Sequence, residues 1–144
     1  MSYAFGEFFA SKGGGAIVNV ASDLALISPD QRVYKSHSVE LSGQETGHPL
    51  KPLSYSVVKS GLLGLTRYFA TLWAPIPVRV NAIAPGSVLD QQSENLINNL
   101  KARIPLERLA RKDEYGGAII FLLSRASSYM TGSVVVVDGG RTAW

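Results

Sequence analysis

The chain has no cysteine, only two histidines and no apolar run long enough to span a membrane. The lack of cysteine excludes disulfides, thiolate catalysis and cysteine-ligated metals. His37 and His48 have no neighbour at the spacing of a metal site, so we predict that both are solvent-exposed and that the protein binds no metal. The N-terminus also lacks a basic region followed by an apolar core, and we therefore expect a cytoplasmic protein without a membrane partner.

Composition is typical of one globular domain. The 144 residues are 46% hydrophobic and 17% charged, which is enough apolar character to form a core. The net charge of +3 comes from 14 basic and 11 acidic residues spread along the chain. The two densest basic spots, residues 101–103 and 108–112, contain interleaved apolar or acidic residues, which favours a solvated face over a nucleic-acid interface.

Three β-branched, apolar runs predict strands, and amphipathic or apolar segments between them predict helices. The strands are expected at 16–21, 78–84 and 134–137, and the helices at 2–12, 54–72, 92–103 and 113–124. The first strand should be buried on both faces, and Asp113 should cap a last helix whose interior, GGAIIFLL, is buried all round. The order helix–strand–helix–strand–helix–strand predicts an α/β fold with a parallel sheet.

Residues 29–52 are polar and have no helical or strand period, so they predict a long loop. Long loops within compact domains tend to be functional or mobile.

The helix at 54–72 carries the most informative pair of residues. Its apolar positions Val58, Leu62, Leu65, Phe69 and Leu72 predict the buried stripe. Tyr55 and Lys59 are four residues apart and so lie on one helix face. An ammonium group beside a phenol favours the phenolate, and such a tyrosine can exchange a proton with a substrate. The alternative is a surface tyrosine packed on a lysine stem.

Other features of the sequence gather at the same edge of the predicted sheet. Ser22 follows the first strand, and Pro85 and Gly86 break the second strand at its carboxyl end. The helix that carries Tyr55 begins on that side. Because ligands bind outside the carboxyl ends of parallel strands, this convergence favours a functional role for the Tyr55–Lys59 pair.

Four motifs in this order resemble the short-chain dehydrogenase/reductase family: GGGAIVNVAS, YSVVKSGLLGLTR, VRVNAIAPG and SSYMTGSVVVVDGG. The resemblance implies a Rossmann-like, doubly wound parallel sheet. It also implies an NAD(P)-dependent oxidoreductase that transfers a hydride between a nicotinamide cofactor and an alcohol or carbonyl substrate. The sequence does not distinguish NAD from NADP.

The resemblance implies roles for three catalytic residues. Tyr55 would be the acid/base that protonates or deprotonates the substrate oxygen. Lys59 would bind the nicotinamide ribose and favour the ionised form of Tyr55. Ser22 would hydrogen-bond the substrate oxygen, as a donor in an oxyanion hole does.

The cofactor-binding residues implied by the family are Tyr55, Lys59, Pro85, Gly86 and Val88. Pro85 and Gly86 would lie against the nicotinamide, where a missing Cβ permits close approach. The backbone of Val88 would reach the carboxamide. Asp90 stands where many members carry a threonine, and its carboxylate would repel a phosphate, so we assign it no such contact.

The chain departs from the family in its first half and in one insertion. It lacks the glycine-rich turn that binds the dinucleotide, so residues 1–144 resemble a single partial domain, the C-terminal catalytic part of a member. The segment from Ser22 to Tyr55 is longer than usual, which makes residues 29–52 an inserted loop. The SPDQR run after Ser22 and this insert resemble members linked to nucleotide-sugar or surface-glycan synthesis, so a nucleotide-sugar-modifying member of the family is a further alternative.

Two further expectations follow. Without the first strands, the strand at 16–21 would expose an apolar edge, so an inactive half-domain that needs a partner chain is the alternative to an enzyme. Family members commonly form dimers or tetramers through the central and last helices, which implies a homo-oligomer. Ser60, Gly61 and Gly64 would permit close helix approach, or would instead pack on the sheet of their own domain.

Overall fold

The computed structural model describes residues 1–34 and 50–144. Its main elements are α1 (Ser2–Ser11), β1 (Gly15–Val20), α2 (Leu53–Leu72), β2 (Val78–Pro85), α3 (Glu94–Lys101), α4 (Gly116–Leu123) and β3 (Val134–Val137). Short 3-10 helices lie between them: η1 (Asp23–Ala25), η2 (Gln31–Tyr34), η3 (Lys112–Tyr115) and η4 (Arg125–Ser127). The predicted strands and helices are confirmed, with ends that differ by a few residues.

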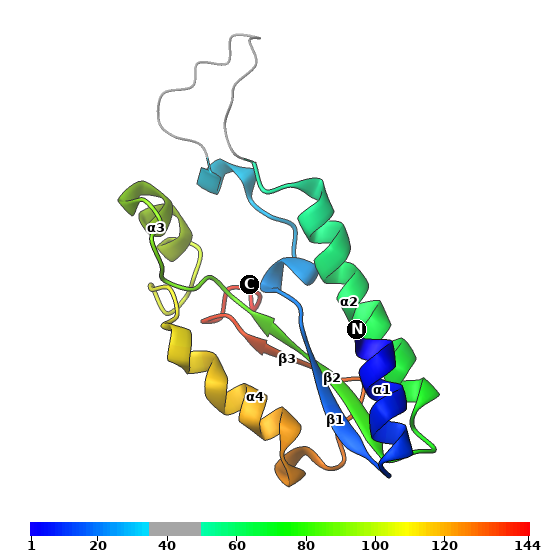
Figure 1. Cartoon of the computed structure of the whole chain (residues 1–144). Helices are drawn as coiled ribbons and strands as arrows, with labels where there is room; N and C mark the ends of the chain where they lie inside the picture. The colour runs from blue at the N-terminus through cyan, green and yellow to red at the C-terminus, as the bar shows by residue number, and fades with distance from the viewer. Residues whose placement is uncertain (35–49) are drawn as a thin grey trace.

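The three strands form one parallel sheet with β2 in the centre (Figure 1). β1 pairs with one edge of β2, where Val20 lies opposite Ile83. β3 pairs with the other edge, where Pro85 lies opposite Val137. All three strands therefore end on the same side of the molecule, as the α/β prediction requires.

Helices cover both faces of the sheet, with α1 and α2 on one face and α4 on the other (Figure 1). Alternation along β2 explains this arrangement, because successive side chains of a strand point to opposite faces. Val80 packs with Phe69 and Trp73 of α2, whereas Ile83 packs with Leu122 of α4. The result is the doubly wound, Rossmann-like layering that the sequence predicts.

The buried face of α2 differs from the predicted stripe. The helix buries Leu63, Thr66, Phe69 and Ala70. Val58, Leu65 and Leu72 are exposed, so the prediction placed most of the stripe one position too early. The pattern failed because polar Thr66 belongs to the core, where its hydroxyl accepts a hydrogen bond from Nδ2 of Asn19 at 2.9 Å. A buried hydroxyl with its partners satisfied is compatible with a core position.

Two other elements are less buried than the sequence predicts. Most side chains of β1 are half-buried and Val20 is exposed, because within the described part of the chain only β2 pairs with this strand. In α4 only Leu122 is buried, and Ile120 is 69% exposed. Apolar surface on α2 and α4 therefore faces outward.

The start of α4 is also organised differently from the prediction. The 3-10 turn η3 begins at Lys112 and leads into α4, so Asp113 lies inside the turn and is not the N-cap. Glu114 makes the capping contact instead, because its carboxylate accepts a hydrogen bond from the Arg111 amide at 2.8 Å. Asp113 pairs with the Arg111 side chain at 3.3 Å.

Part of the predicted loop at 29–52 is helical, since η2 lies within it. Asp30 anchors this turn: its carboxylate accepts hydrogen bonds from Arg32 and from Arg103, the latter at 2.7 Å. These two guanidinium groups hold the pKa of Asp30 well below its usual range. The predictions for His37 and His48 lie outside the described residues.

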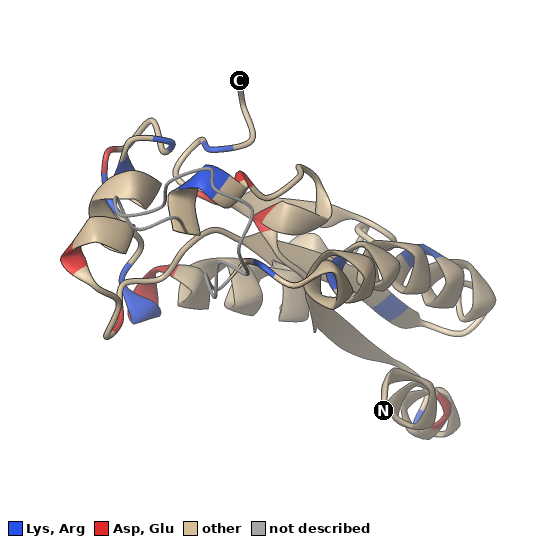
Figure 2. Ribbon diagram, turned by 90° about the horizontal axis from the view of Figure 1, so that it is seen from above, with Lys and Arg blue, Asp and Glu red and all other residues tan. Residues whose placement is uncertain are grey.

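Across residues 1–34 and 50–144, no helix has the length and apolar character that a bilayer crossing requires. Basic and acidic positions lie close together along the ribbon at the end of the molecule away from the N-terminus (Figure 2). Arg108 pairs with Glu114 at 2.7 Å and Lys112 pairs with Asp90 at 2.9 Å. The basic spot at 108–112 is therefore partly neutralised by carboxylates.

Candidate active site

Tyr55 and Lys59 lie in the first turns of α2, beside the carboxyl end of the sheet. The Lys59 ammonium is 5.8 Å from the ring centroid of Tyr55, which agrees with side chains four residues apart on a helix. Lys59 also donates a hydrogen bond to the Val20 carbonyl at 2.8 Å, which ties the helix to the end of β1. An ammonium has three N–H donors, so two remain for a ligand.

Ser22 follows β1 directly and is buried. Its Oγ accepts a hydrogen bond from the Leu24 amide at 3.2 Å and so caps η1. The same hydroxyl donates to Oδ1 of Asp23 at 2.9 Å. These two bonds fix the Ser22 hydroxyl at the carboxyl end of the sheet.

The other predicted residues lie at the end of β2 and in the turn after it: Pro85 ends the strand, and Gly86 and Val88 follow. A Cβ at Gly86 would lie 2.8 Å from the Cα of Asp138, so a glycine is required here for the end of β3 to pack. The sequence assigned this small residue to close approach of a nicotinamide, whereas the contact that the structure shows is with Asp138. The carbonyl of Val88 accepts a hydrogen bond from Nε2 of Gln92 at 2.8 Å.

One cavity of about 410 Å³ joins most of these residues. Its lining includes Ser22, Tyr55, Gly86 and Val88. Lys59 and Pro85 are outside the lining, although Lys59 contacts the cavity wall through Tyr55 and Pro85 precedes Gly86 in the chain. The volume is in the range of small-molecule sites in proteins.

Four titratable residues of this cavity were missed by the sequence analysis: Asp23, Tyr34, Lys51 and Arg141. Lys51 lies over the ring of Tyr55, with its ammonium 4.0 Å from the ring centroid, closer than that of Lys59. Lys51 precedes the helix, so helical spacing could not place it. The sequence feature that could have identified Lys51 is the run KPLSY, which places a lysine four residues before Tyr55.

A buried ion pair joins two distant parts of the chain in the cavity wall. Nη1 of Arg141, which follows β3, lies 3.0 Å from Oδ2 of Asp23, which follows β1, and both side chains are less than a tenth exposed. Removing one member of such a pair leaves an uncompensated buried charge. The pair therefore holds the Ser22–Asp23 segment against the C-terminal segment.

Tyr34 places a second phenol in the cavity. Burial raises the pKa of Tyr34, nearby Asp23 and Tyr55 add to this effect, and Arg141 opposes it. A phenol with a raised pKa stays protonated near neutral pH and can donate a hydrogen bond.

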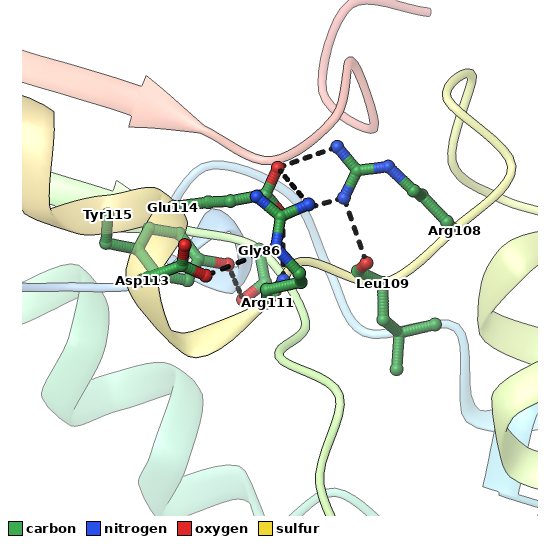
Figure 3. A network of polar contacts seen from close by, with 7 residues as sticks. All are labelled: Gly86, Arg108, Leu109, Arg111, Asp113, Glu114 and Tyr115. Atoms are coloured by element: carbon green, nitrogen blue, oxygen red, sulfur yellow. Dashed lines mark hydrogen bonds and ion pairs between the residues drawn. The ribbon is translucent and has the colours of Figure 1, made fainter.

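A polar network supports the Gly86 turn from the side of α4 (Figure 3). The Tyr115 hydroxyl donates to the Gly86 carbonyl at 3.1 Å, and burial raises the pKa of Tyr115. Next to it, Glu114 accepts two hydrogen bonds from Arg108, at 2.7 and 2.8 Å, and one from the Arg111 amide. The turn that lines the cavity is thus fixed to the start of α4.

This network predicts a pH dependence of stability. The Arg108 guanidinium, with help from Arg111, lowers the pKa of Glu114 from 4.5 to about 2. The contribution of Glu114 to stability is therefore complete above pH 4.5 and is lost as the pH falls toward 2. We expect Glu114→Gln to flatten the rise in melting temperature across this pH interval.

The measurement is thermal unfolding of both proteins by circular dichroism from pH 2 to pH 6, with Asp113→Asn as the control for a neighbouring exposed carboxylate. A Glu114→Gln variant whose melting temperature follows pH as steeply as the parent's would contradict the role of the network.

Hydrogen-bond donors that suit hydroxyl and amide groups of a ligand lie around the cavity. Lys59 has two N–H donors left, and Tyr55 offers a hydroxyl. The bridge between Val88 and Ala110 uses the Leu89 amide and the Ser87 carbonyl, so this bridge does not engage the Val88 amide. Among the described residues, no three His, Asp or Glu side chains are placed to hold a metal ion.

The family model described as Enoyl-(Acyl carrier protein) reductase matches residues 1–142. Galactitol 2-dehydrogenase (L-tagatose-forming) of Cereibacter sphaeroides is 34% identical over an alignment of 149 positions that covers 99% of this chain and 52% of that protein. Cis-4-hydroxycyclohexanecarboxylate dehydrogenase of Sinomonas cyclohexanicum is 36% identical over 138 residues, 93% of this chain and 47% of that protein.

Among solved structures, a short-chain dehydrogenase of Leptospira borgpetersenii with bound NAD+ superposes with a TM-score of 0.84 at 32% identity. The match covers 98% of this chain and 50% of the Leptospira chain. This chain spans about half the length of the relatives that it matches.

Proposed function

The chain belongs to the short-chain dehydrogenase/reductase family, and on that premise we propose that it is the catalytic part of an NAD(P)-dependent oxidoreductase. The reaction transfers a hydride between the nicotinamide and an alcohol/carbonyl substrate. The observation that supports this most directly is that Ser22 and Tyr55, from separate segments, line one cavity beside Lys59.

In the direction of oxidation, Tyr55 accepts the proton of the substrate hydroxyl, while the Ser22 hydroxyl turns its one proton from Asp23 to the same oxygen. The substrate C–H bond breaks with its electron pair, the carbonyl forms, and Tyr55 passes its proton to solvent. NAD+ or NADP+, when bound, supplies the hydride acceptor. Alcohol and NAD(P)+ thus give carbonyl, NAD(P)H and one proton.

The other residues position these groups. Lys59 would hold the nicotinamide ribose with the N–H donors that Val20 leaves free. The Val88 amide would bind the carboxamide, and the Pro85–Gly86 turn would form the surface beneath the ring. In this proposal Asp90 makes no phosphate contact, and its charge is balanced by Lys112 at 2.9 Å.

We further propose that residues 1–144 form one partial Rossmann-like domain that acts with a dinucleotide-binding half, and that residues 29–52 are an insertion relative to other family members. The support is the edge of β1, which in the described residues pairs only with β2 and exposes Val20. That same edge favours the second candidate function, an inactive half-domain that pairs with another chain.

The test is reduction of NAD+ or NADP+ by a panel of secondary alcohols that begins with galactitol and cis-4-hydroxycyclohexanecarboxylate, followed by the absorbance of the reduced nicotinamide. We expect alcohol-dependent reduction by one of the two cofactors. Absence of reduction and of cofactor binding, in a folded protein that contains residues 1–144 together with a dinucleotide-binding half, would reject the oxidoreductase and favour the inactive half-domain.

The exposed apolar faces of α2 and α4 support a homo-oligomer. On α2, Val57, Val58 and Tyr68 are exposed, and a Cβ added at Gly61 or Gly64 would meet open space. These glycines therefore do not pack on the sheet of their own chain. Large, exposed apolar faces mark interaction sites, and a second copy of the chain offers the same faces in return.

We expect Ile120→Glu in α4 and Val57→Glu in α2 each to lower the mass in solution, because each buries a charge in the proposed interface. Sedimentation velocity measures the mass, and Leu106→Glu, an exposed leucine in a loop, is the control that should leave it unchanged. A monodisperse monomer in the parent protein would reject the homo-oligomer.

A further inference from the structure

We propose that Lys51 makes the site selective for substrates that carry an anionic group, a carboxylate or a phosphate, close to the reacting carbon. The proposal rests on the proposed function, because it names the substrate class of the same cavity. Its starting point is the position of Lys51 in the lining, with its ammonium 4.0 Å from the centroid of the Tyr55 ring.

The backbone of Lys51 is held in place by a side chain from another element. Gln31 of η2 accepts a hydrogen bond from the Lys51 amide at 3.0 Å and donates one to the Lys51 carbonyl at 3.2 Å. This two-sided clamp fixes the segment that leads into α2. The ammonium is thus presented to the cavity from a positioned backbone.

The other charges in the cavity wall are compensated. Asp23 pairs with Arg141 at 3.0 Å, and Asp90 pairs with Lys112 at 2.9 Å. Lys51, in contrast, forms no ion pair with any residue in the ranges 1–34 and 50–144. Its positive charge is therefore the charge that a ligand in the cavity would meet.

An anionic ligand suits this position better than a neutral one. A carboxylate or phosphate would form a charge-assisted hydrogen bond with the ammonium, and such bonds are roughly twice as strong as neutral ones. Because Lys51 lies on the ring whose hydroxyl would take the substrate proton, the anionic group must be near the carbon that is oxidised. A short hydroxy acid, polyol acid or polyol phosphate meets this requirement.

The experiment compares pairs of substrates that differ at one group, a carboxylate in the anion and a neutral group in its counterpart: galactonate with galactitol, and cis-4-hydroxycyclohexanecarboxylate with its amide. In the parent protein we expect higher kcat/KM for the anion of each pair. Lys51→Met should lower kcat/KM for the anion by roughly 10-fold to 100-fold and leave the neutral substrate nearly unchanged. Lys51→Arg should retain most of the preference.

Lys12→Met is the matched control, since Lys12 also lies over an aromatic ring, that of Phe8 at 5.8 Å, but at the C-cap of α1 and outside the cavity lining. Lys12→Met should leave kcat/KM unchanged for both members of each pair. Equal losses for both members of a pair in Lys51→Met, with a shifted pH profile, would overturn the proposal, because they would show that Lys51 acts on Tyr55.

Binding separates this proposal from the proposed function. If no alcohol is oxidised, the oxidoreductase fails, and titration of the protein with galactonate and galactitol by NMR still decides the role of Lys51. Shifts caused by galactonate alone, lost in Lys51→Met, support anion recognition. Equal shifts from both compounds, or shifts that survive the substitution, overturn it.

Discussion

Tyr55→Phe is expected to lower turnover by roughly 10²-fold to 10⁴-fold, the contribution of general acid–base catalysis to many enzymes. Phenylalanine retains the ring and removes only the hydroxyl, so the contacts of the ring with Lys51 and Lys59 persist. The substrate oxygen then has no group that can exchange its proton. The measurement is kcat with the best alcohol from the panel, at saturating cofactor.

The control for this substitution lies on the same helix. Tyr68 is exposed and outside the cavity lining, so Tyr68→Phe should leave kcat within about twofold of the parent. Cofactor affinity, measured by fluorescence titration, should change little in Tyr55→Phe. Turnover that survives in Tyr55→Phe would remove Tyr55 from the mechanism, whereas loss of cofactor binding would assign it a binding role.

Local pattern was sufficient to predict the strands and the central helix. The β-branched runs specify β1, β2 and β3 without reference to the rest of the chain, and they are found in one parallel sheet. Burial was predicted less well because it depends on what covers each face. The outward position of Val58 and Ile120 and the buried position of Thr66 follow from tertiary packing that periodicity does not contain.

In the candidate site, too, residues in local motifs were predicted and residues positioned by tertiary contacts were not. Ser22 and Tyr55 were identified because each lies in a local motif, at a strand end or on a helix face, and both line the cavity. Lys51 was missed because it precedes the helix that carries Tyr55, and Arg141 was missed because its partner is distant: it meets Asp23 across 118 positions of the sequence. Contacts of this kind depend on how the carboxyl ends of the strands are brought together.

Arg141→Met is expected to be the most destabilising single substitution considered for this protein. Breaking a buried ion pair by removal of one partner costs about 3–5 kcal/mol, because the remaining charge is buried without compensation. Here the remaining charge is Asp23, which is 4% exposed and accepts hydrogen bonds from the Ser22 hydroxyl and the Leu24 amide. Loss of Arg141 should therefore also loosen the position of Ser22.

The pair can be tested against its own neutral replacement. Asp23→Asn combined with Arg141→Met removes both charges, so the double variant should recover a large part of the stability that Arg141→Met loses. Urea unfolding of the four proteins of the cycle measures the coupling, and Arg125→Met, at an exposed position, should change the free energy of unfolding by less than about 0.5 kcal/mol.

If Arg141→Met costs no more than Arg125→Met, or if the double variant is no more stable than Arg141→Met alone, the ion pair does not hold the two segments together. Recovery of stability without recovery of kcat would show that Ser22 depends on the charge of Asp23 for its position.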